Sequence, residues 1–194
     1  MSSKRSFRAV AVYCGSSNRV DSKYLDVATH VGTELASRGV GVVYGGGSVG
    51  LMGAVADGAL QAGGRVDGVI TDKLMDMELG HPRLTELIVT KTMGERKMKM
   101  ASLADAFIGL PGGWGTLEEV FEVVTLTQLE YHRKPVGLLN AGGYYDHLIA
   151  FLDHAAGEGF IRPSHRGLIS CASTIEGLLG QLEVAELPGV AGLF

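Results

Sequence analysis

The chain alternates short apolar runs with longer segments of helical periodicity, and this alternation limits the folds open to it. Residues 8–13 and 40–44 have the length and apolar character of buried strands, and amphipathic helical patterns follow both. Strands that alternate with helices form mainly parallel, doubly wound sheets with helices on both faces. The sequence therefore predicts a Rossmann-like α/β fold, whose ligands bind beyond the carboxyl ends of the strands.

The same patterns locate the expected elements. We expect strands at residues 8–13, 40–44, 65–70, 86–90, 106–110, 134–139 and 168–171. We expect helices at residues 22–39, 51–64, 93–105, 116–129, 144–159 and 174–182, the first of them ending at Gly39 as a C-terminal cap. No boundary or repeat interrupts the pattern, so residues 1–194 are predicted to form a single nucleotide-binding domain, with the first few and the last ~10 residues flexible.

Charge and composition exclude several classes of partner. The net charge is −4 and no Lys/Arg-rich run occurs, so we expect no nucleic-acid surface. No segment approaches the ~18 consecutive apolar residues of a membrane span, and the N-terminus lacks a signal-peptide pattern. The two cysteines, Cys14 and Cys171, form no CxxC motif, which is typical of a reducing compartment. We therefore expect a cytoplasmic protein with no membrane contact.

Glycines cluster where the apolar runs end, as in "GGGSVG" at residues 45–50. This segment matches the dinucleotide fingerprint GxGxxG, and Asp72 follows about twenty residues later. However, it follows the second strand rather than the first, and no second domain remains for a substrate. Two other interpretations stay open: glycines that allow close packing of strand and helix, or a loop that contacts a mononucleotide through Gly46 and Gly47.

Two other segments are weaker candidates. "YCGSS" at residues 13–17 ends the first strand, where Ser17 could bind a ribose or phosphate, although a plain turn explains it nearly as well. "MGERK" at residues 93–97 begins a helix with Arg96 and Lys97, although the helix dipole opposes cations there. That run is either a solvated charged surface or a site for an anion or an acidic partner residue.

The segment "PGGWGTLEE" at residues 111–119 is the most informative. Its glycines leave backbone N–H groups accessible where a strand passes into a helix, and Thr116 adds a hydroxyl, so the segment can hold a phosphate. Glu118 and Glu119 follow, and a carboxylate beside a bound phosphate would repel it by roughly 1 kcal/mol or more. The acids either complement the helix dipole or stabilise an oxocarbenium-like carbon, as in glycoside cleavage.

Together these segments resemble the LOG (Lonely Guy) family of cytokinin-activating phosphoribohydrolases. The resemblance covers nearly the whole chain, through "VYCGSS", "VYGGGSVGLMG", "MGERK", "ADAFIGLPGGWGTLEEVFEV" and "KPVGLLN". It implies hydrolysis of the N-glycosidic bond of a cytokinin riboside 5′-monophosphate, which releases the free base and ribose 5-phosphate. It also implies a homodimer or larger assembly with the active site near the subunit interface. This hydrolysis requires no metal ion or redox cofactor, and we predict none.

The resemblance also implies roles for individual residues. The catalytic pair of the family falls on Arg96 and Glu119. Arg96 would stabilise charge electrostatically, since a guanidinium with a pKa above ~12 is a poor proton donor. The implied substrate contacts fall on Glu78, Arg96, Lys97, Gly113, Trp114, Gly115, Thr116, Leu117, Glu118 and Thr125.

The sequence departs from the family at three positions. Gly94 stands where the family usually has histidine, Thr71 where it usually has proline, and Trp114 where it often has tyrosine. None of these changes removes Arg96 or Glu119, so activity is expected while the preferred base is open.

Three other functions stay open or are weighed against this one. A general purine nucleoside 5′-monophosphate nucleosidase would use the same residues, and a non-catalytic nucleotide carrier would need the loop but not the acids. Members of the family are often labelled lysine decarboxylases, but pyridoxal-phosphate chemistry requires a Schiff-base lysine and a larger scaffold. Nothing in the sequence indicates such a lysine.

Overall fold

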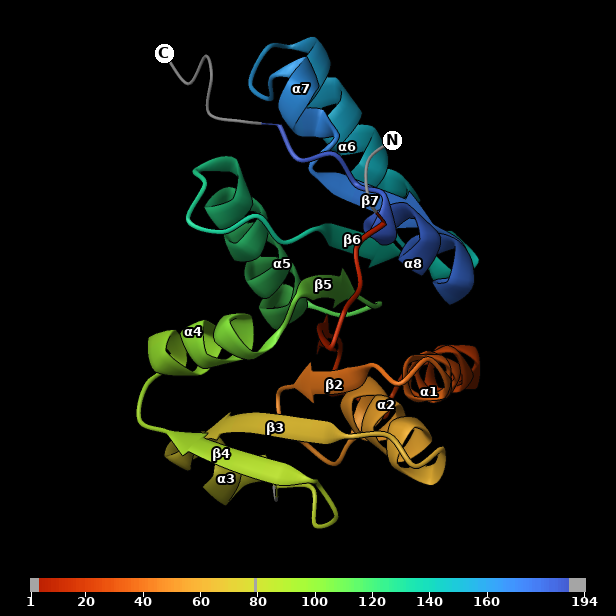
Figure 1. Ribbon diagram of the computed structural model, residues 1–194, viewed down its shortest axis with the longest axis vertical. Coiled ribbons are helices and arrows are strands. Elements are labelled where there is room, and N and C mark those ends of the chain that lie inside the picture. Colours follow the sequence, from red (N-terminus) through yellow and green to blue (C-terminus); the bar gives the residue numbers. More distant parts are fainter. Residues whose placement is uncertain (1–3, 79, 189–194) are drawn as a thin grey trace.

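The computed structural model describes residues 4–78 and 80–188, which form a seven-stranded sheet in the order β4-β3-β2-β1-β5-β6-β7 (Figure 1). Every neighbouring pair of strands is parallel. The strands are β1 (Ala9–Tyr13), β2 (Gly41–Tyr44), β3 (Val66–Thr71), β4 (Glu86–Thr90), β5 (Ala106–Gly109), β6 (Val136–Leu139) and β7 (Ile169–Ala172). The predicted doubly wound α/β fold is confirmed.

The order of the strands determines where a ligand can bind. The chain begins in the middle of the sheet at β1, proceeds outward to β4, and then returns to β5 on the other side of β1. The loops that leave β1 and β5 therefore diverge to opposite sides, and a crevice opens between them at the carboxyl ends of the strands.

Helices cover both faces of this sheet. The longer helices are α1 (Ser22–Ser37), α2 (Gly50–Gln61), α4 (Met93–Leu103), α5 (Trp114–Gln128), α6 (Asp146–Gly157) and α8 (Ile175–Glu183). The short ones are α3 (Asp72–Glu78), α7 (Pro163–Arg166) and the 3-10 turn η1 (Ala141–Gly143). Figure 1 shows α1, α2 and α8 on one side of the sheet and α4 and α5 on the other.

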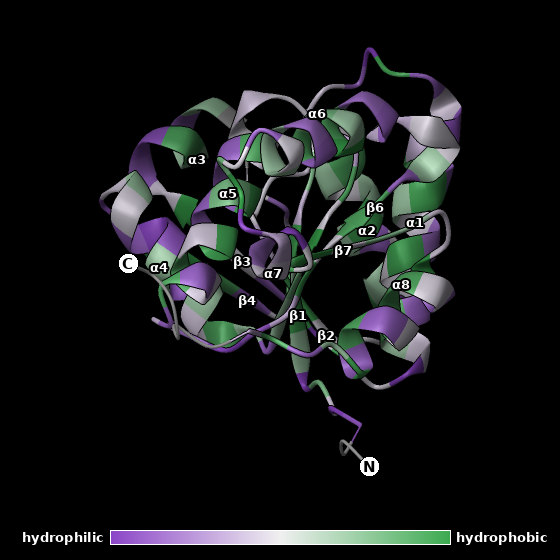
Figure 2. Cartoon of the chain, turned by 90° about the horizontal axis from the view of Figure 1, so that it is seen from above, coloured by the Kyte–Doolittle hydropathy of each residue, from purple (hydrophilic) through white to green (hydrophobic). Residues whose placement is uncertain are grey.

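Alternate residues along a strand pack into two separate hydrophobic cores, one on each face of the sheet. On β1, Val10 and Val12 pack with α1, α2 and α8, whereas Ala11 and Tyr13 pack with α4 and α5. All four side chains are at most 2% exposed, as expected for a parallel strand covered on both faces. Figure 2 shows this arrangement as green, apolar central strands surrounded by helices that alternate green and purple.

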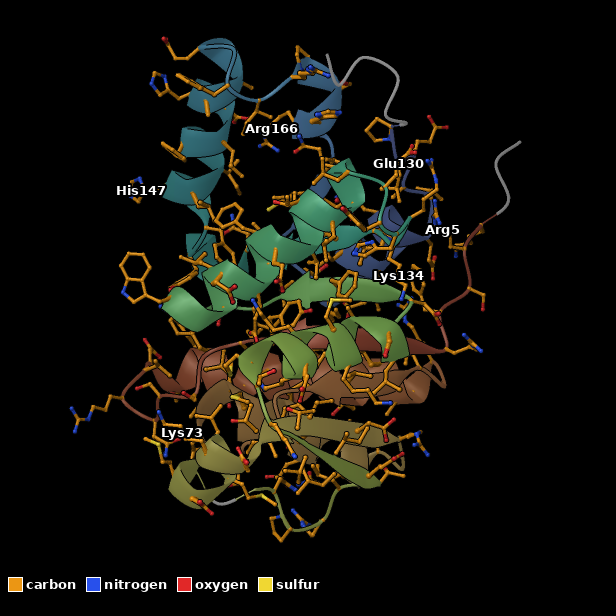
Figure 3. The ribbon with its side chains drawn as sticks, turned by 90° about the vertical axis from the view of Figure 1, so that its left-hand side faces the viewer. Arg5, Lys73, Glu130, Lys134, His147 and Arg166 are labelled. Carbon is orange, nitrogen blue, oxygen red and sulfur yellow. The ribbon has the colours of Figure 1, made fainter. Side chains whose placement is uncertain are left out.

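A half-buried cation links the end of α4 to the neighbouring half of the sheet. Lys134, which is labelled in Figure 3, precedes β6. Its Nζ donates to the carbonyl of Ala101 near the end of α4, at 2.7 Å. Burial lowers the pKa of this ammonium, and Arg8 contributes to the shift, while Asp105 opposes it. The contact satisfies one of the carbonyl groups that the last turn of a helix leaves without an intrahelical partner.

Most predicted elements are confirmed within a few residues, and two short helices are additional. Gly39 has the positive φ of +70° expected of a residue after a helix end. Helices α3 and α7 were not predicted. Cys14 and Cys171 are both free thiols. In the described part of the chain, the helices are too short or too polar to cross a bilayer. The termini predicted to be flexible fall largely outside the described residues.

Candidate active site

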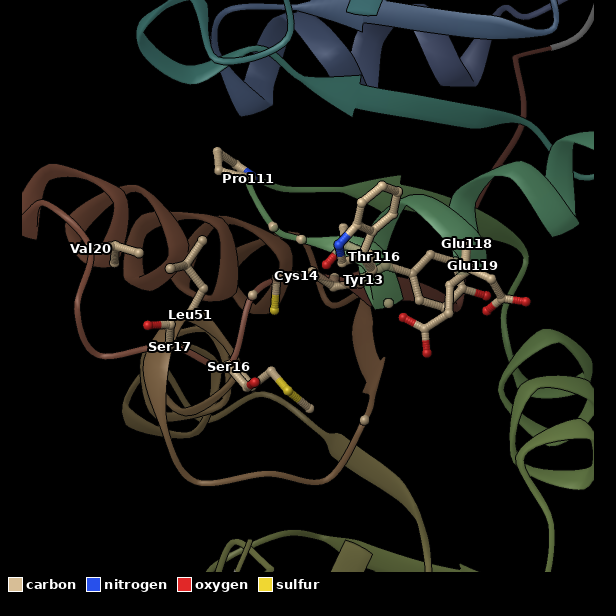
Figure 4. Close-up of a pocket in the computed structure, with 18 of the residues that line it drawn as sticks. Tyr13, Cys14, Ser16, Ser17, Val20, Leu51, Pro111, Thr116, Glu118 and Glu119 are labelled. Carbon is tan, nitrogen blue, oxygen red and sulfur yellow. The ribbon is translucent and has the colours of Figure 1, made fainter.

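A cavity of about 520 Å³ lies at the carboxyl ends of β1 and β5, where the fold predicts the crevice. It is enclosed by the end of β1 and the loop after it, the start of α2, the loop after β5 and the first turns of α5. Single residues of α1 and α3, two residues of α4, and Tyr144, which follows η1, complete the wall. Figure 4 shows Glu118, Glu119 and Thr116 on one side of the cavity and Ser17, Val20 and Leu51 on the other. The cavity therefore has an acidic side and a largely apolar side.

The loop after β5 presents the uncapped start of a helix to this cavity. Helix α5 begins at Trp114 with Gly113 as N-cap, and no side chain caps it. A Cβ atom built on Gly113 or Gly115 would meet nothing within 4 Å, whereas one on Gly112 would lie 2.1 Å from Thr116 Oγ1. First-turn N–H groups without a side-chain acceptor, at the positive end of a helix dipole, are suited to bind an anion such as a phosphate.

Arg96 and Glu119 form a buried ion pair in the wall of the cavity. Arg96 Nη1 lies 2.8 Å from Glu119 Oε1, and Arg96 Nε donates to the carbonyl of Val69 at 2.9 Å. The two residues are only 6% and 8% exposed. Burial raises the pKa of the Glu119 carboxyl, and the Arg96 guanidinium offsets part of that shift. The site therefore contains a carboxylate that is shielded from water and oriented by one fixed cation.

A second, more exposed ion pair lies beside the first. Lys97 Nζ contacts Glu118 Oε1 and lies 2.9 Å from Glu122 Oε1. Burial lowers the pKa of Lys97, but the hydrogen bonds and charges of the two carboxylates outweigh burial and raise it overall. The basic run at the start of α4 therefore meets acidic partner residues, which was one of the interpretations left open by the sequence.

The position of the two acids on α5 differs from the sequence-based expectation. The predicted helix of residues 116–129 would place both acids in its first turn, but the helix begins at Trp114, and its first turn contains no acidic residue. Glu118 and Glu119 lie in the second turn and contact α4. Matching of the helix dipole, which acts within the first turn, is therefore not their main interaction.

The structure brings most of the candidate residues to one cavity. The candidates that line it are Ser17, Arg96, Gly113, Trp114, Gly115, Thr116, Glu118 and Glu119. The candidates that do not line it are Gly46, Gly47, Lys97, Leu117 and Thr125. Glu78 is the last residue of α3, and its side chain lies outside the described part of the structure.

The candidates outside the cavity have identifiable contacts elsewhere. The carbonyl of Gly46 accepts a hydrogen bond from His81 N at 3.0 Å, and that of Gly47 accepts one from the Tyr44 hydroxyl at 3.1 Å. Thr125 Oγ1 donates to the carbonyl of Phe121, and the residue lines a smaller cavity of about 150 Å³. Gly46 and Gly47 therefore connect the loop after β2 to neighbouring segments of the fold.

The cavity wall also contains residues beyond the individual candidates above. Some of them lie in the segments 13–17, 45–50, 93–97 and 111–119 that the sequence had singled out, and sequence reasoning missed the others. The additional lining residues are Val12, Tyr13, Cys14, Gly15, Ser16, Val20, Tyr24, Gly45, Leu51, Met52, Leu74, Met93, Pro111, Gly112 and Tyr144. Tyr144 is the clearest of these, because its hydroxyl donates to the carbonyl of Gly112 at 2.7 Å and so braces the glycine loop. Burial raises the pKa of the Cys14 thiol, which is therefore a poor nucleophile.

The fold and the cavity together define a class: a Rossmann-like protein with a glycine loop suited to phosphate and a buried Arg–Glu pair beside it. The family model described as "Possible lysine decarboxylase" matches residues 52–182. A relative from Oryza sativa subsp. japonica, "Probable cytokinin riboside 5'-monophosphate phosphoribohydrolase LOGL9", is 51% identical over 91% of this chain and 78% of its own length. A relative from Arabidopsis thaliana, "Cytokinin riboside 5'-monophosphate phosphoribohydrolase LOG3", is 48% identical over 93% of this chain and 84% of its own length. The chain belongs to the LOG family, which confirms the resemblance seen in its motifs.

Solved structures agree on the fold. The molybdenum cofactor carrier protein of Chlamydomonas reinhardtii matches with a TM-score of 0.67 at 22% identity, over 87% of this chain and 91% of that chain. The molybdenum cofactor binding protein of Rippkaea orientalis matches with a TM-score of 0.66 at 24% identity, over 87% of this chain and 90% of that chain. At these identities the similarity concerns the fold alone.

Proposed function

We propose that this protein hydrolyses the N-glycosidic bond of cytokinin riboside 5′-monophosphates and releases the free base and ribose 5-phosphate. The observation that carries the proposal is the buried Arg96–Glu119 pair, which lines the same cavity as the uncapped start of α5. The names of relatives at 51% and 48% identity supply the substrate class.

The geometry suggests how the reaction proceeds. The N–H groups of residues 113–116 hold the 5′-phosphate, and this contact positions the ribose toward Glu119. As the C1′–N9 bond breaks, positive charge develops on the sugar, and the Glu119 carboxylate stabilises it and orients the attacking water. The water oxygen bonds to C1′ and keeps one of its two protons, and the base leaves with the electron pair of the C1′–N9 bond and gains the other proton. Arg96 contributes a fixed positive charge rather than a proton.

A lysine decarboxylase reaction fits this site poorly. A Schiff-base lysine must lose its proton to attack a carbonyl group, and enzymes lower the pKa of such a lysine by burial or by a nearby cation. The opposite holds for Lys97, whose pKa is raised by Glu118 and Glu122. The lysine beside this site is therefore held in its protonated form.

We also propose that the protein is a single-domain, cytoplasmic homodimer with the active site near the subunit interface. Trp114, Tyr131 and Phe160 are 90%, 77% and 89% exposed, so each is available for contact with a partner subunit. Lys97 and Thr125, both implied as substrate contacts, do not line the cavity of their own chain. A dimer in which they approach the partner's cavity would account for both observations.

Product analysis tests the proposed reaction. The protein is incubated separately with isopentenyladenosine monophosphate, AMP and isopentenyladenosine, and the products are separated by chromatography. We expect free base from the first substrate, much less from AMP and none from the riboside, which lacks the phosphate. Equal release from AMP would indicate a general purine nucleotidase. No release by folded protein that still binds nucleotide would indicate a carrier.

The buried carboxyl group also predicts a pH dependence. Burial raises the pKa of Glu119 above its ordinary value of 4.5, so kcat/KM should fall with a slope of about one as the pH drops through this raised pKa. The folded chain binds this proton more tightly than the unfolded chain does. The stability contributed by the proton is therefore fully present below pH 4.5 and is lost as the pH rises through the folded pKa. An acid limb centred at or below 4.5 in the pH–rate profile would contradict the assignment.

A further inference from the structure

Gly45, the first glycine after β2, has no backbone reason to be glycine. The glycines with positive φ include Gly46 and Gly50 in the same loop, but Gly45 is not among them. An alanine could therefore adopt its backbone conformation without strain. The reason for a glycine must lie in what its missing side chain would contact.

That space is occupied by two side chains of the active-site cavity. A Cβ atom on Gly45 would lie 2.2 Å from Arg96 Nη2 and 2.4 Å from Met52 Cε. Both atoms are the ends of flexible side chains, and both residues line the cavity. The fold could yield at this position, but only if these two side chains moved.

Other crowded glycines of the same region contrast with Gly45. A Cβ atom on Gly53 would lie 2.3 Å from the carbonyl oxygen of Ser48, and one on Gly58 would lie 2.2 Å from that of Thr29. Those overlaps involve backbone atoms, so side chains there would force helices or loops apart. Of these three glycines, only Gly45 has its nearest contacts with side chains of the cavity.

The guanidinium of Arg96 has little freedom to move away. Its Nε donates to the carbonyl of Val69 on β3, and its Nη1 pairs with Glu119. The residue is only 6% exposed, so these two contacts, rather than solvent, determine where its guanidinium lies. Displacement by a methyl group at position 45 must lengthen or break at least one of these two hydrogen bonds.

We propose that Gly45 is a positioning residue: the absence of a side chain there creates the space in which the Arg96 guanidinium is held against Glu119. This inference rests on the function proposed above for the Arg96–Glu119 pair. It also assigns the first glycine of "GGGSVG" to the support of a catalytic side chain rather than to contact with a nucleotide.

The variant Gly45→Ala tests this role. We expect a folded protein whose kcat/KM is lowered about 100-fold, because small displacements of a catalytic group have effects of this size. We also expect the pKa of Glu119 to rise further as its cation moves away. A carboxyl-carbon NMR titration, with the Glu119 resonance assigned through Glu119→Gln, measures this shift without any need for turnover.

The titration must be interpreted against every charged or titratable group near Glu119. Besides Arg96, these are Lys97 of α4, Glu118 of α5 itself, and Tyr13 and Cys14 at the end of β1. Burial raises the pKa of both Tyr13 and Cys14, and the Glu119 charge adds to each shift. Neither group therefore ionises in the acid range in which Glu119 is titrated.

Gly58→Ala is the matched control, because its overlap is equally severe but lies between α1 and α2. We expect it to lower the thermal midpoint of unfolding and leave the Glu119 titration unchanged. A double-mutant cycle with Arg96→Lys adds a second criterion. If Gly45 acts through Arg96, then Gly45→Ala has little further effect on kcat/KM in that background.

Three results would overturn the proposal. The first is an unfolded Gly45→Ala protein, and the second is a Glu119 titration that is unchanged in that variant. The third is a double variant in which the decreases in kcat/KM caused by Gly45→Ala and Arg96→Lys multiply. Failure of the proposed function is distinguishable from these results. A wild-type protein that hydrolyses no nucleotide, combined with a shifted Glu119 titration in Gly45→Ala, would refute the reaction while the positioning role of Gly45 stands.

Discussion

Replacement of Glu119 by glutamine is expected to lower kcat by about a thousandfold or more, equivalent to about 4 kcal/mol of transition-state stabilisation. The neutral amide keeps the size of the carboxylate and can still accept a hydrogen bond from Arg96. It cannot stabilise positive charge developing at C1′. The loss should therefore appear in kcat, while phosphate binding, which we assign to the uncapped start of α5, should be retained.

The measurement combines three assays on Glu119→Gln. Chromatography of the products gives kcat, thermal unfolding gives the stability, and fluorescence of Trp114, the single tryptophan of the chain, reports nucleotide binding. Glu122→Gln, one turn further along α5 and outside the cavity lining, is the matched control and should retain activity within a few-fold. Near-full activity in Glu119→Gln would refute the mechanism.

The sequence predicted the architecture well because the controlling signals are local. Each strand is a short apolar run and each long helix has its own periodicity, so their alternation could be read without knowledge of contacts. Helices α3 and α7 were not predicted because neither has a clear local signal of this kind. Helix α3 follows directly from β3, and its first turn is capped by Thr71 Oγ1, which accepts from Leu74 N. Helix α7 has only four residues, too few to establish a period.

The candidate site was predictable where it is contiguous in the sequence. Anion binding by the glycine loop of residues 111–116 could be predicted from that segment alone, since it joins a strand to a helix without a capping side chain. The choice between Glu118 and Glu119 was different. On a helix these neighbours point about 100° apart, and only the packing of α4 against α5 determines that one meets Lys97 and the other Arg96.

Contacts between distant segments could not be predicted from residue patterns at all. Tyr144 braces Gly112 across 32 positions of the chain, and Arg96 reaches the carbonyl of Val69 across 27. Neither contact leaves a periodic or compositional signal. The role of Arg96 and Glu119 came from the family resemblance rather than from periodicity, and the buried ion pair gives that resemblance a physical basis.

The two neighbouring ion pairs differ in what they contribute. Glu118 is exposed enough for its contact with Lys97 to be worth little, as is usual for pairs near the surface. The side chains of Arg96 and Glu119 are only 7% and 11% exposed. Removing two charges from water costs desolvation free energy, which apolar residues of similar volume would not require. A site that keeps such a pair beside an anion-binding loop is consistent with selection for chemistry rather than for stability.

Replacement of Arg96 by methionine is therefore expected to have two large effects. The first is a decrease in kcat/KM of about a thousandfold, because the variant loses the cation that contacts Glu119 and that we propose stabilises charge on the departing base. The second is a decrease of about 3–5 kcal/mol in the free energy of unfolding at neutral pH, since Glu119 is left buried without a partner. Activity assays and urea unfolding at several pH values measure both effects.

The pH dependence of unfolding separates this account from a simple packing defect. Without Arg96, the folded pKa of Glu119 rises further, so the variant binds the Glu119 proton more tightly when folded than when unfolded. The lost stability should therefore return as the pH is lowered through that folded pKa, and it should decline again as the pH rises. The double variant Arg96→Met/Glu119→Gln removes the buried charge and should recover much of the stability at neutral pH without recovering activity. A stability loss that is the same at every pH, and unchanged by the second substitution, would show that Arg96 acts through packing alone.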